Sequence, residues 1–236
     1  MMLSVERVNV YLQASHILHD VSLHVAEREV VCLVGRNGAG KTTTLRTIMG
    51  YLKPHSGAIR FQGRDITRLP TFQIARLGIG YAPEESEIFP DLTVEENIAI
   101  ATWTRPSERP GRERIELAYK VFPRLREYRL RKGTQMSGGE RKMLSIARAL
   151  ALDPALLLLD EPFEGLSPAI IPVVAEGIAA ITQLGRAILI AESNIYHVPA
   201  FADRLYVIER GEILYQGSPA AAEREPAVQR VIRGGT

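Results

Sequence analysis

The sequence predicts an α/β protein with a mainly parallel core, an antiparallel β subdomain near the N-terminus and an inserted helical subdomain. For the core, an apolar strand, a glycine-rich loop and a helix follow one another from Val30 to Leu45, and a second apolar run, Ala155–Leu159, ends in two acids. For the insert, no strand pattern occurs between Glu85 and Gln135. The expected bounds are one domain over 1–236, with 1–85 and 153–236 as the core and 86–152 as the helical subdomain.

The composition fits one domain with a sizeable core. Of the 236 residues, 46% are hydrophobic and 24% are charged, which argues against disorder and against a long coiled coil. The net charge of +2 gives no sign of a nucleic-acid partner. The single cysteine, Cys32, lies in an apolar strand and is expected to be a buried thiol in a reducing compartment. No signal peptide opens the chain, and no run reaches the ~18 apolar residues of a membrane span, so other chains must supply any membrane part.

The remaining elements are predicted from turn residues and apolar spacing. The expected strands are Leu3–Val10, Val21–Val25, Ala58–Phe61 and Gly78–Ala82, and a short helix is expected over Pro70–Leu77. Thr93 followed by Glu96 forms a capping box, which predicts a helix ending near Ala101. The later segments are expected to be a solvated loop over Thr104–Arg112, helices interrupted at Pro123 over Glu113–Arg131, and a closing helix from Ser218.

The loop after the first apolar strand matches the phosphate-binding pattern G-x-x-x-x-G-K-[ST] at every specified position. A triphosphate is wrapped by backbone N–H groups, and glycines let the chain come that close. Lys41 can place its charge against the β and γ phosphates, and the hydroxyl of Thr42 is a ligand that Mg²⁺ prefers. The sequence therefore predicts a P-loop NTPase. The expected nucleotide contacts are Gly35, Arg36, Asn37, Gly38, Ala39, Gly40, Lys41, Thr42 and Thr43.

Two further groups of residues carry candidate chemistry. Ser137, Gly138, Gly139 and Glu140 open an apolar-periodic helix and predict a second anion site at its N-terminus. Asp160 and Glu161 end the second apolar run, so Asp160 can hold Mg²⁺ through water and Glu161 can polarise a water aimed at the γ-phosphate. Tyr11 lies upstream of the phosphate loop, where it is either a base-stacking ring or an ordinary edge-strand aromatic.

The ordered set of phosphate loop, Ser-Gly-Gly-Glu and LLLLDEP resembles the nucleotide-binding subunit of ATP-binding cassette (ABC) transporters, which has a RecA-like core. The resemblance runs from Tyr11, at the family's adenine-stacking aromatic, to Ile213 near the end. Within the family, Pro83-Glu84 and the segments Phe89–Asn97 and Gly165–Pro168 are similar to the ATPase of branched-chain amino acid importers whose switch segment is E-x-N and lacks histidine.

This resemblance implies a mechanism that one chain cannot complete. Two cassettes sandwich two ATP molecules with Mg²⁺, and Glu84 would sense the γ-phosphate or the metal. The implied partners are membrane permease subunits, a second copy or a paralogous ATPase, and indirectly a periplasmic solute-binding protein, with the cassette at the cytoplasmic face of the inner membrane. Phe89 and Leu92 are candidates for the permease contact, and local packing of the insert is the alternative.

Departures from the family pattern leave two points open. Ser193 stands where the family has histidine and where this subfamily usually has glutamine. One possibility is a phosphate contact that is weaker than that of histidine or is mediated by water. The other is that Ser193 caps the following helix. A regulatory subunit with low hydrolysis at its own site is therefore an alternative. Glu85-Ser86-Glu87 replaces a Gly-Arg-Arg run, which leaves the permease and substrate open and makes another transporter class the main alternative. Coiled-coil ABC proteins, tandem-cassette translation factors and GTPases are disfavoured, because the chain lacks a long insert, a second cassette and an N-K-x-D motif.

Overall fold

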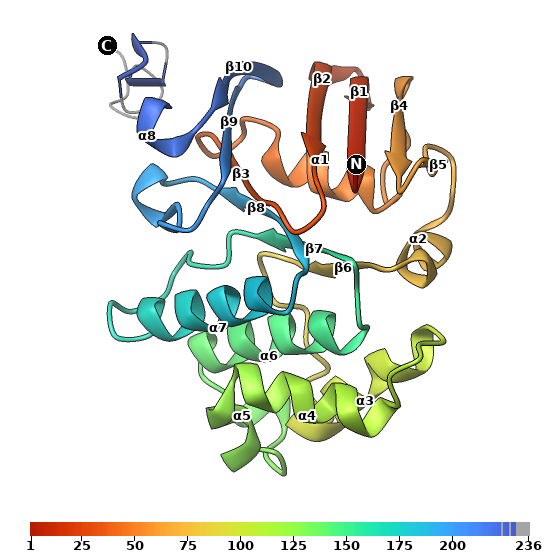
Figure 1. Ribbon diagram of the computed structural model, residues 1–236, viewed down its shortest axis with the longest axis vertical. Helices are drawn as coiled ribbons and strands as arrows, with labels where there is room; N and C mark the ends of the chain where they lie inside the picture. Colours follow the sequence, from red (N-terminus) through yellow and green to blue (C-terminus); the bar gives the residue numbers. More distant parts are fainter. Residues whose placement is uncertain (223, 227, 230–236) are drawn as a thin grey trace. The chain divides into compact units, whose positions relative to one another are not determined.

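The computed structural model describes residues 1–222, 224–226, 228 and 229 of the chain (Figure 1). Contacts divide the chain into two compact units. The first comprises Met1–Ile74 and the chain from Ala187 onward, and the second comprises Ala75–Arg186. The chain is α/β, as expected, while the subdomain bounds deduced from the sequence stay a prediction.

The first unit contains the expected antiparallel β subdomain. Its four strands, in the order β2-β1-β4-β5, are β1 (Leu3–Leu12), β2 (Ser15–Val25), β4 (Ser56–Phe61) and β5 (Arg64–Asp65). The hairpin of β1 and β2 is longer than predicted, because Tyr11 pairs with His16 and Leu12 with Ser15 beyond the apolar stretch. Strand β1 pairs with β2 on one side and β4 on the other, so Tyr11 does not belong to an edge strand.

The same unit holds the parallel strands that carry the phosphate loop. Strand β3 (Val30–Val34) lies between β8 (Ala187–Glu192) and β9 (Arg204–Glu209) and is parallel to both. Strand β10 (Glu212–Gly217) is antiparallel to β9, and helix α1 (Lys41–Ile48) follows β3. All five residues of β3 are buried, which explains its continuous apolar run. Cys32 is buried as expected, and burial raises the pKa of its thiol.

The second unit is built from helices and one parallel strand pair, β6 (Ile79–Ala82) with β7 (Leu156–Asp160). Its helices are α3 (Val94–Thr104), α4 (Gly111–Val121), α5 (Pro123–Glu127), α6 (Gly138–Ala151) and α7 (Ile171–Gln183), with a 3₁₀ turn at Gly133–Gln135. Helices α3, α4 and α5 gather beside α6 (Figure 1). The Thr93 capping box and the break at Pro123 are both confirmed.

The remaining short elements lie in the chain between these strands. Helix α2 (Thr71–Leu77) is close to its predicted bounds, and a 3₁₀ turn covers Ile195–His197. The predicted closing helix is observed only as α8 (Pro219–Ala222), and part of the stretch beyond it lies outside the described residues. Within the described part of the chain, none of the helices has the length and apolar character needed to cross a membrane.

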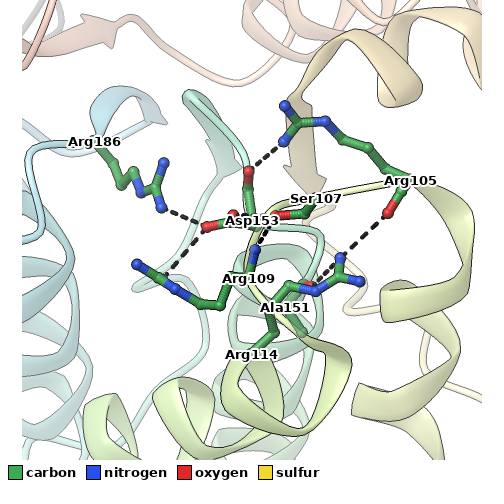
Figure 2. A network of polar contacts seen from close by, with 7 residues as sticks. All are labelled: Arg105, Ser107, Arg109, Arg114, Ala151, Asp153 and Arg186. Carbon is green, nitrogen blue, oxygen red and sulfur yellow. Dashed lines mark hydrogen bonds and ion pairs between the residues drawn. The ribbon is translucent and has the colours of Figure 1, made fainter.

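The stretch between α3 and α4 contains no buried residue, which agrees with the solvated loop that the sequence predicts, but it also makes polar contacts that were not predicted. Arg105 Nη1 donates to the backbone oxygen of Asp153 at 2.5 Å, and the Ser107 hydroxyl donates to Asp153 Oδ2 at 2.6 Å (Figure 2). Arg109 and Arg186 both pair with Asp153 Oδ1. Arg105, Ser107 and Arg109 thus tie the loop to Asp153, whose side chain is only 14% exposed. The sequence did not predict these contacts, because Asp153 lies some 45 residues further along the chain than the loop.

The same network determines the charge of Asp153. Burial alone would raise the pKa of the carboxyl, but the hydrogen bond from Ser107 and the charges of Arg186, Arg109 and Arg105 outweigh it and lower that pKa below its ordinary value. Arg114 completes the cluster by donating to the backbone oxygens of Arg105 and Ala151 (Figure 2).

We expect Asp153→Asn to lower the free energy of unfolding by about 1–3 kcal/mol at neutral pH, because the guanidinium groups of Arg109 and Arg186 lose their shared carboxylate. A lowered folded-state pKa contributes stability above the unfolded-state pKa, about 4, and that stability is lost as the pH falls through the folded value. Urea unfolding of both proteins between pH 7 and pH 3 measures this. The difference should shrink toward pH 3, and a constant difference would contradict the assignment. Glu6→Gln, which alters an exposed ion pair with Arg60, is the control.

Candidate functional site

The phosphate loop lies in the first unit between β3 and α1. Gly35 N donates to the backbone oxygen of Glu192 at 3.1 Å, which ties the start of the loop to the end of β8. The ammonium of Lys41, only 5% exposed, donates to the backbone oxygens of Gly35 at 2.7 Å and Arg36 at 3.2 Å. These two carbonyls fix the ammonium to the loop. A phosphate taken up by the loop would therefore meet a charge that is already in place.

Two glycines of the loop are required by space and by backbone conformation. A Cβ on Gly35 would lie 2.2 Å from the backbone oxygen of Ile208, so no side chain fits there. Gly40 has φ +110° and precedes α1 as its N-cap without a capping side chain. The first N–H groups of α1 therefore have no side-chain acceptor at the cap, which is the arrangement that binds anions.

The two predicted acids lie in the second unit at the end of β7. Asp160 and Glu161 are 1% and 3% exposed, so their carboxylates lie within the protein. The hydroxyl of Tyr81, on β6, donates to Asp160 Oδ2 at 2.9 Å and orients that carboxylate. Glu161 has φ +47°, an unusual conformation for a residue with a Cβ, and such strain concentrates at functional positions.

Lys142 is a site residue that sequence reasoning missed. Its buried ammonium donates to the backbone oxygens of Glu84 at 2.5 Å and Glu161 at 3.0 Å. Two predicted site residues, from segments far apart in the sequence, are thereby held by one side chain of α6. The only signal in the sequence is a lysine next to the apolar positions of that helix, which does not identify its partners.

The Ser-Gly-Gly-Glu segment forms the N-terminus of α6 as predicted. Ser137 Oγ accepts from Glu140 N at 3.3 Å, and Glu140 Oε2 accepts from Ser137 N at 2.7 Å, so the two residues form a capping box. The Glu140 carboxylate is therefore used by the protein, whereas the hydroxyl hydrogen of Ser137 is not needed for the cap. Gly138 has open space where a side chain would be, which suits close approach of a ligand.

The switch segment follows β8 in the first unit. Asn194 caps the Ile195–His197 turn by accepting from Tyr196 N at 3.0 Å, so the alternative in which Ser193 is the cap is wrong. Asn194 is better placed because the cap must directly precede the turn. His197 Nδ1 lies 3.4 Å from Oε2 of the fully buried Glu192, so this histidine pairs with the residue before Ser193.

Tyr11 and Phe89 present exposed rings. Tyr11 is 46% exposed and stacks on His16, while Phe89 is 46% exposed and lies against the guanidinium of Arg148, with 5.3 Å from Cζ to the ring centre. Leu92 is half-buried. Phe89 is therefore not part of the core of the insert, while Leu92 remains compatible with either packing or docking.

Each unit thus contains one set of the expected residues. The first unit holds Tyr11, Gly35–Thr43 and Ser193, and the second holds Glu84, Ser137–Glu140, Asp160 and Glu161. Among the described residues, no group of three His, Cys, Asp or Glu side chains could form a metal site by itself. Thr42 in the first unit and Asp160 and Glu84 in the second carry oxygen groups of the kind that Mg²⁺ prefers, and their role as its ligands stays a prediction.

A glycine loop with a buried lysine, a capped Ser-Gly-Gly helix and an Asp-Glu strand end together define an ATP-binding cassette. The chain belongs to the ABC transporter family, whose family profile matches residues 18–164. It is an ABC transporter ATPase subunit, and the prediction of ATP binding and hydrolysis is confirmed at this level.

Several curated proteins resemble this chain over nearly its whole length. The high-affinity branched-chain amino acid transport ATP-binding protein BraG of Pseudomonas aeruginosa is 41% identical over 99% of this chain and 100% of its own length. A probable branched-chain amino acid transport ATP-binding protein, LivF of Archaeoglobus fulgidus, is 36% identical over 92% of both chains. The lipopolysaccharide export system ATP-binding protein LptB of Escherichia coli is also 36% identical, over 92% of this chain and 91% of its own.

Solved ABC cassettes share the fold. A nucleotide-free ATP-binding cassette from an ABC transporter superposes with a TM-score of 0.85, at 27% identity over 98% of both chains. The ADP conformation of another transporter cassette gives 0.84, at 28% identity over 100% of this chain and 99% of the other. The predicted P-loop NTPase fold is therefore confirmed.

We expect Lys142→Met to reduce kcat for ATP hydrolysis about 10- to 100-fold while KM changes little, because small displacements of Glu84 and Glu161 misplace reacting groups. Steady-state kinetics of the chain with its transporter partners measures both constants. Lys120→Met, on the exposed side of α4, is the matched control. A loss confined to KM would show that Lys142 acts on nucleotide binding instead.

Proposed function

We propose that this chain is the ATP-hydrolysing subunit of an importer for branched-chain amino acids or related small amides and acids. The observation that carries the ATPase role is the pair of buried ammonium groups, Lys41 and Lys142, which hold the phosphate loop and the Glu84 and Glu161 backbones. The importer role is supported by the identity with BraG over the full length of that protein.

In the proposed mechanism, each group of site residues has its own role. The loop from Gly35 to Thr43 wraps the phosphates with its N–H groups, and Lys41 neutralises the β and γ phosphates. Glu161 accepts a proton from the attacking water, with a geometry that depends on Lys142. Mg²⁺, when bound, supplies charge neutralisation to the β and γ oxygens. The residues proposed to hold it are Thr42, Asp160 and Glu84, whose hydroxyl and carboxylate oxygens fit that ion.

The Ser-Gly-Gly segment is proposed to act on the nucleotide of a neighbouring cassette. Cassettes of this family work as dimers with membrane permease components. The Ser137 hydroxyl and the N–H groups of Gly138 and Gly139 are suited to donate to a γ-phosphate that a partner presents. Whether this partner is a second copy or a paralogous ATPase is left to the experiment below.

The permease is proposed to dock near Glu85–Leu92, with the exposed ring of Phe89 as its main contact. Such docking would place the chain at the cytoplasmic face of the inner membrane as a peripheral subunit. A periplasmic solute-binding protein would then act on the complex only through the permease. Tyr11 is proposed to stack on the adenine, and the exposure of its ring supports this role.

Two alternatives follow from particular observations. The similarity to lipopolysaccharide export ATPases at 36–38% identity keeps another transporter class as the second candidate. The serine at position 193 supports a subunit with low hydrolysis at its own site, because a short neutral side chain interacts weakly with a γ-phosphate.

We expect Lys41→Ala to abolish ATP binding, because the phosphates lose their nearest fixed cation, whereas Glu161→Gln should keep binding and reduce hydrolysis by about 10²- to 10⁴-fold. Calorimetric titration with Mg-ATP and phosphate-release assays measure the two effects. Lys120→Ala is the control for the removal of one lysine. Retention of ATP affinity by Lys41→Ala would overturn the proposed ATPase role.

The same Glu161→Gln variant also tests the alternative in which this chain is a subunit with low hydrolysis at its own site. In a complex with a paralogous partner, Glu161→Gln in this chain and the equivalent substitution in the partner are made separately. If the site built on this chain hydrolyses ATP slowly, the two variants should lose different fractions of the ATP turnover. Equal losses would contradict that alternative.

We expect the chain to co-purify with a permease whose solute-binding protein binds leucine, isoleucine or valine, and Lys41→Ala to stop uptake of the bound amino acid. Pull-down from detergent extract, followed by binding measurements with amino acids, amides, urea and aromatic acids, identifies the substrate. Recovery of a lipopolysaccharide-export permease instead would favour the second candidate.

A further inference from the structure

The turn after β8 ends in a histidine that faces a buried carboxylate. His197 is the last residue of the 3₁₀ turn Ile195–His197, and its Nδ1 lies 3.4 Å from Oε2 of Glu192, the last residue of β8. The Glu192 side chain has no exposed surface, whereas the imidazole is 23% exposed. Because a carboxylate only accepts hydrogen bonds, Nδ1 carries the hydrogen of this contact. The imidazole therefore donates to the carboxylate from a partly exposed position.

Glu192 is also attached to the start of the phosphate loop. In the parallel pair of β3 and β8, it lies opposite Val34, the residue before Gly35. Its backbone oxygen accepts from Gly35 N at 3.1 Å. Glu192 thus determines where the segment after β8 lies relative to the loop.

The chain between Glu192 and His197 folds back on itself. Asn194 accepts through its side chain from Tyr196 N at 3.0 Å, and through its backbone oxygen from His197 N, also at 3.0 Å. The contact between His197 and Glu192 closes this turn, because it joins the last residue of the turn to the strand from which the turn began. Ser193 is thus part of a segment in which both of its neighbours are held by hydrogen bonds.

The burial of Glu192 explains why it needs such a donor. An ionised carboxylate without exposed surface loses its hydration, and that cost is offset only by hydrogen bonds or by a nearby positive charge. Cys32, on the neighbouring strand β3, supplies no positive charge, and burial together with the charge of Glu192 raises the pKa of its thiol. An imidazole supplies an N–H donor, and in its protonated form also a positive charge. The contact with His197 therefore stabilises Glu192 in the observed position.

A serine at position 193 depends strongly on the position of its backbone. The hydroxyl is attached to Cβ, so only the χ1 torsion moves it, and its place otherwise follows the main chain. A longer side chain could compensate for a displaced backbone by changing its rotamer, and serine cannot. A phosphate-directed hydroxyl at this position thus relies on the contacts that hold Glu192 and Asn194.

We propose that His197 is a positioning residue for ATP hydrolysis, which holds Glu192 and thereby keeps Ser193 fixed relative to the start of the phosphate loop. The inference rests on the ATPase role of the chain and on the proposed phosphate contact of Ser193, and it adds a residue outside the ABC motifs. His197 acts through Glu192 and has no nucleotide contact of its own in this proposal. Its removal should slow hydrolysis more than it weakens ATP binding, because Lys41 and the N–H groups of the loop remain.

The test measures steady-state ATP hydrolysis of the chain with its transporter partners. His197→Ala should lower kcat about 10-fold and leave KM for ATP nearly unchanged, the effect of losing one hydrogen bond to a charged group. His197→Asn should retain most of the activity, because its amide nitrogen is attached to Cγ, as Nδ1 is, and can donate to Glu192. Tyr196→Ala is the matched control, because Tyr196 belongs to the same turn and its ring is 86% exposed.

Two further variants separate the hydrogen bond from packing of the ring. His197→Phe keeps an aromatic ring in the turn but cannot donate, so its kcat should fall as far as that of His197→Ala. In a Glu192→Gln background, His197→Ala should cause little additional loss, because the carboxylate on which it acts is absent.

Four outcomes would each overturn the inference. They are an unchanged kcat in His197→Phe, a loss in His197→Asn as large as in His197→Ala, additive losses in the Glu192→Gln background, and a change confined to KM. The proposed ATPase role fails separately, if Lys41→Ala leaves ATP binding unchanged.

Discussion

The candidate site residues of each unit depend on the same kind of interaction, a buried ammonium that donates to two backbone carbonyls. Lys41 holds the phosphate loop through Gly35 and Arg36, and Lys142 holds the backbones of Glu84 and Glu161. A buried ammonium is costly unless its donors are satisfied, so each lysine stabilises the one loop conformation that satisfies them. The two lysines therefore determine both the backbone conformation and the positive charge of these segments.

Support from such hydrogen bonds explains how the site tolerates an unfavourable backbone conformation. Gly40 at φ +110° can adopt its conformation because it has no Cβ, whereas Glu161 at φ +47° has one and needs support from its surroundings. Its backbone oxygen accepts from both Lys142 and Glu164 N, which opposes relaxation of the turn. The carboxylate of Asp160 is oriented by the Tyr81 hydroxyl from the neighbouring strand. Buried side chains without a proposed catalytic role thus determine where the proposed catalytic groups lie.

Much of the fold could be predicted because its signals are local. The phosphate loop, the Thr93 capping box, the helix start at Ser137 and the break at Pro123 each depend on residues within a few positions of one another. Lys142, Tyr81 and the Asp153 network escaped prediction because their partners are far along the chain, and nothing in the local pattern marks them. Ser193 as the cap after β8 was one of two alternatives for that residue, and the adjacent Asn194, which is an equally good capping residue, forms the cap instead.

The burial of Cys32 has a practical consequence for spectroscopy. It is the sole cysteine of the chain, it lies in the middle of β3 with no exposed surface, and burial disfavours its thiolate. Maleimide and methanethiosulfonate reagents attack thiolates that solvent can reach, so we expect the native Cys32 thiol not to react with them. Cysteines introduced singly at surface positions can then carry fluorophores or nitroxides, and interprobe distances within each unit can be followed through the nucleotide cycle without first removing a native thiol.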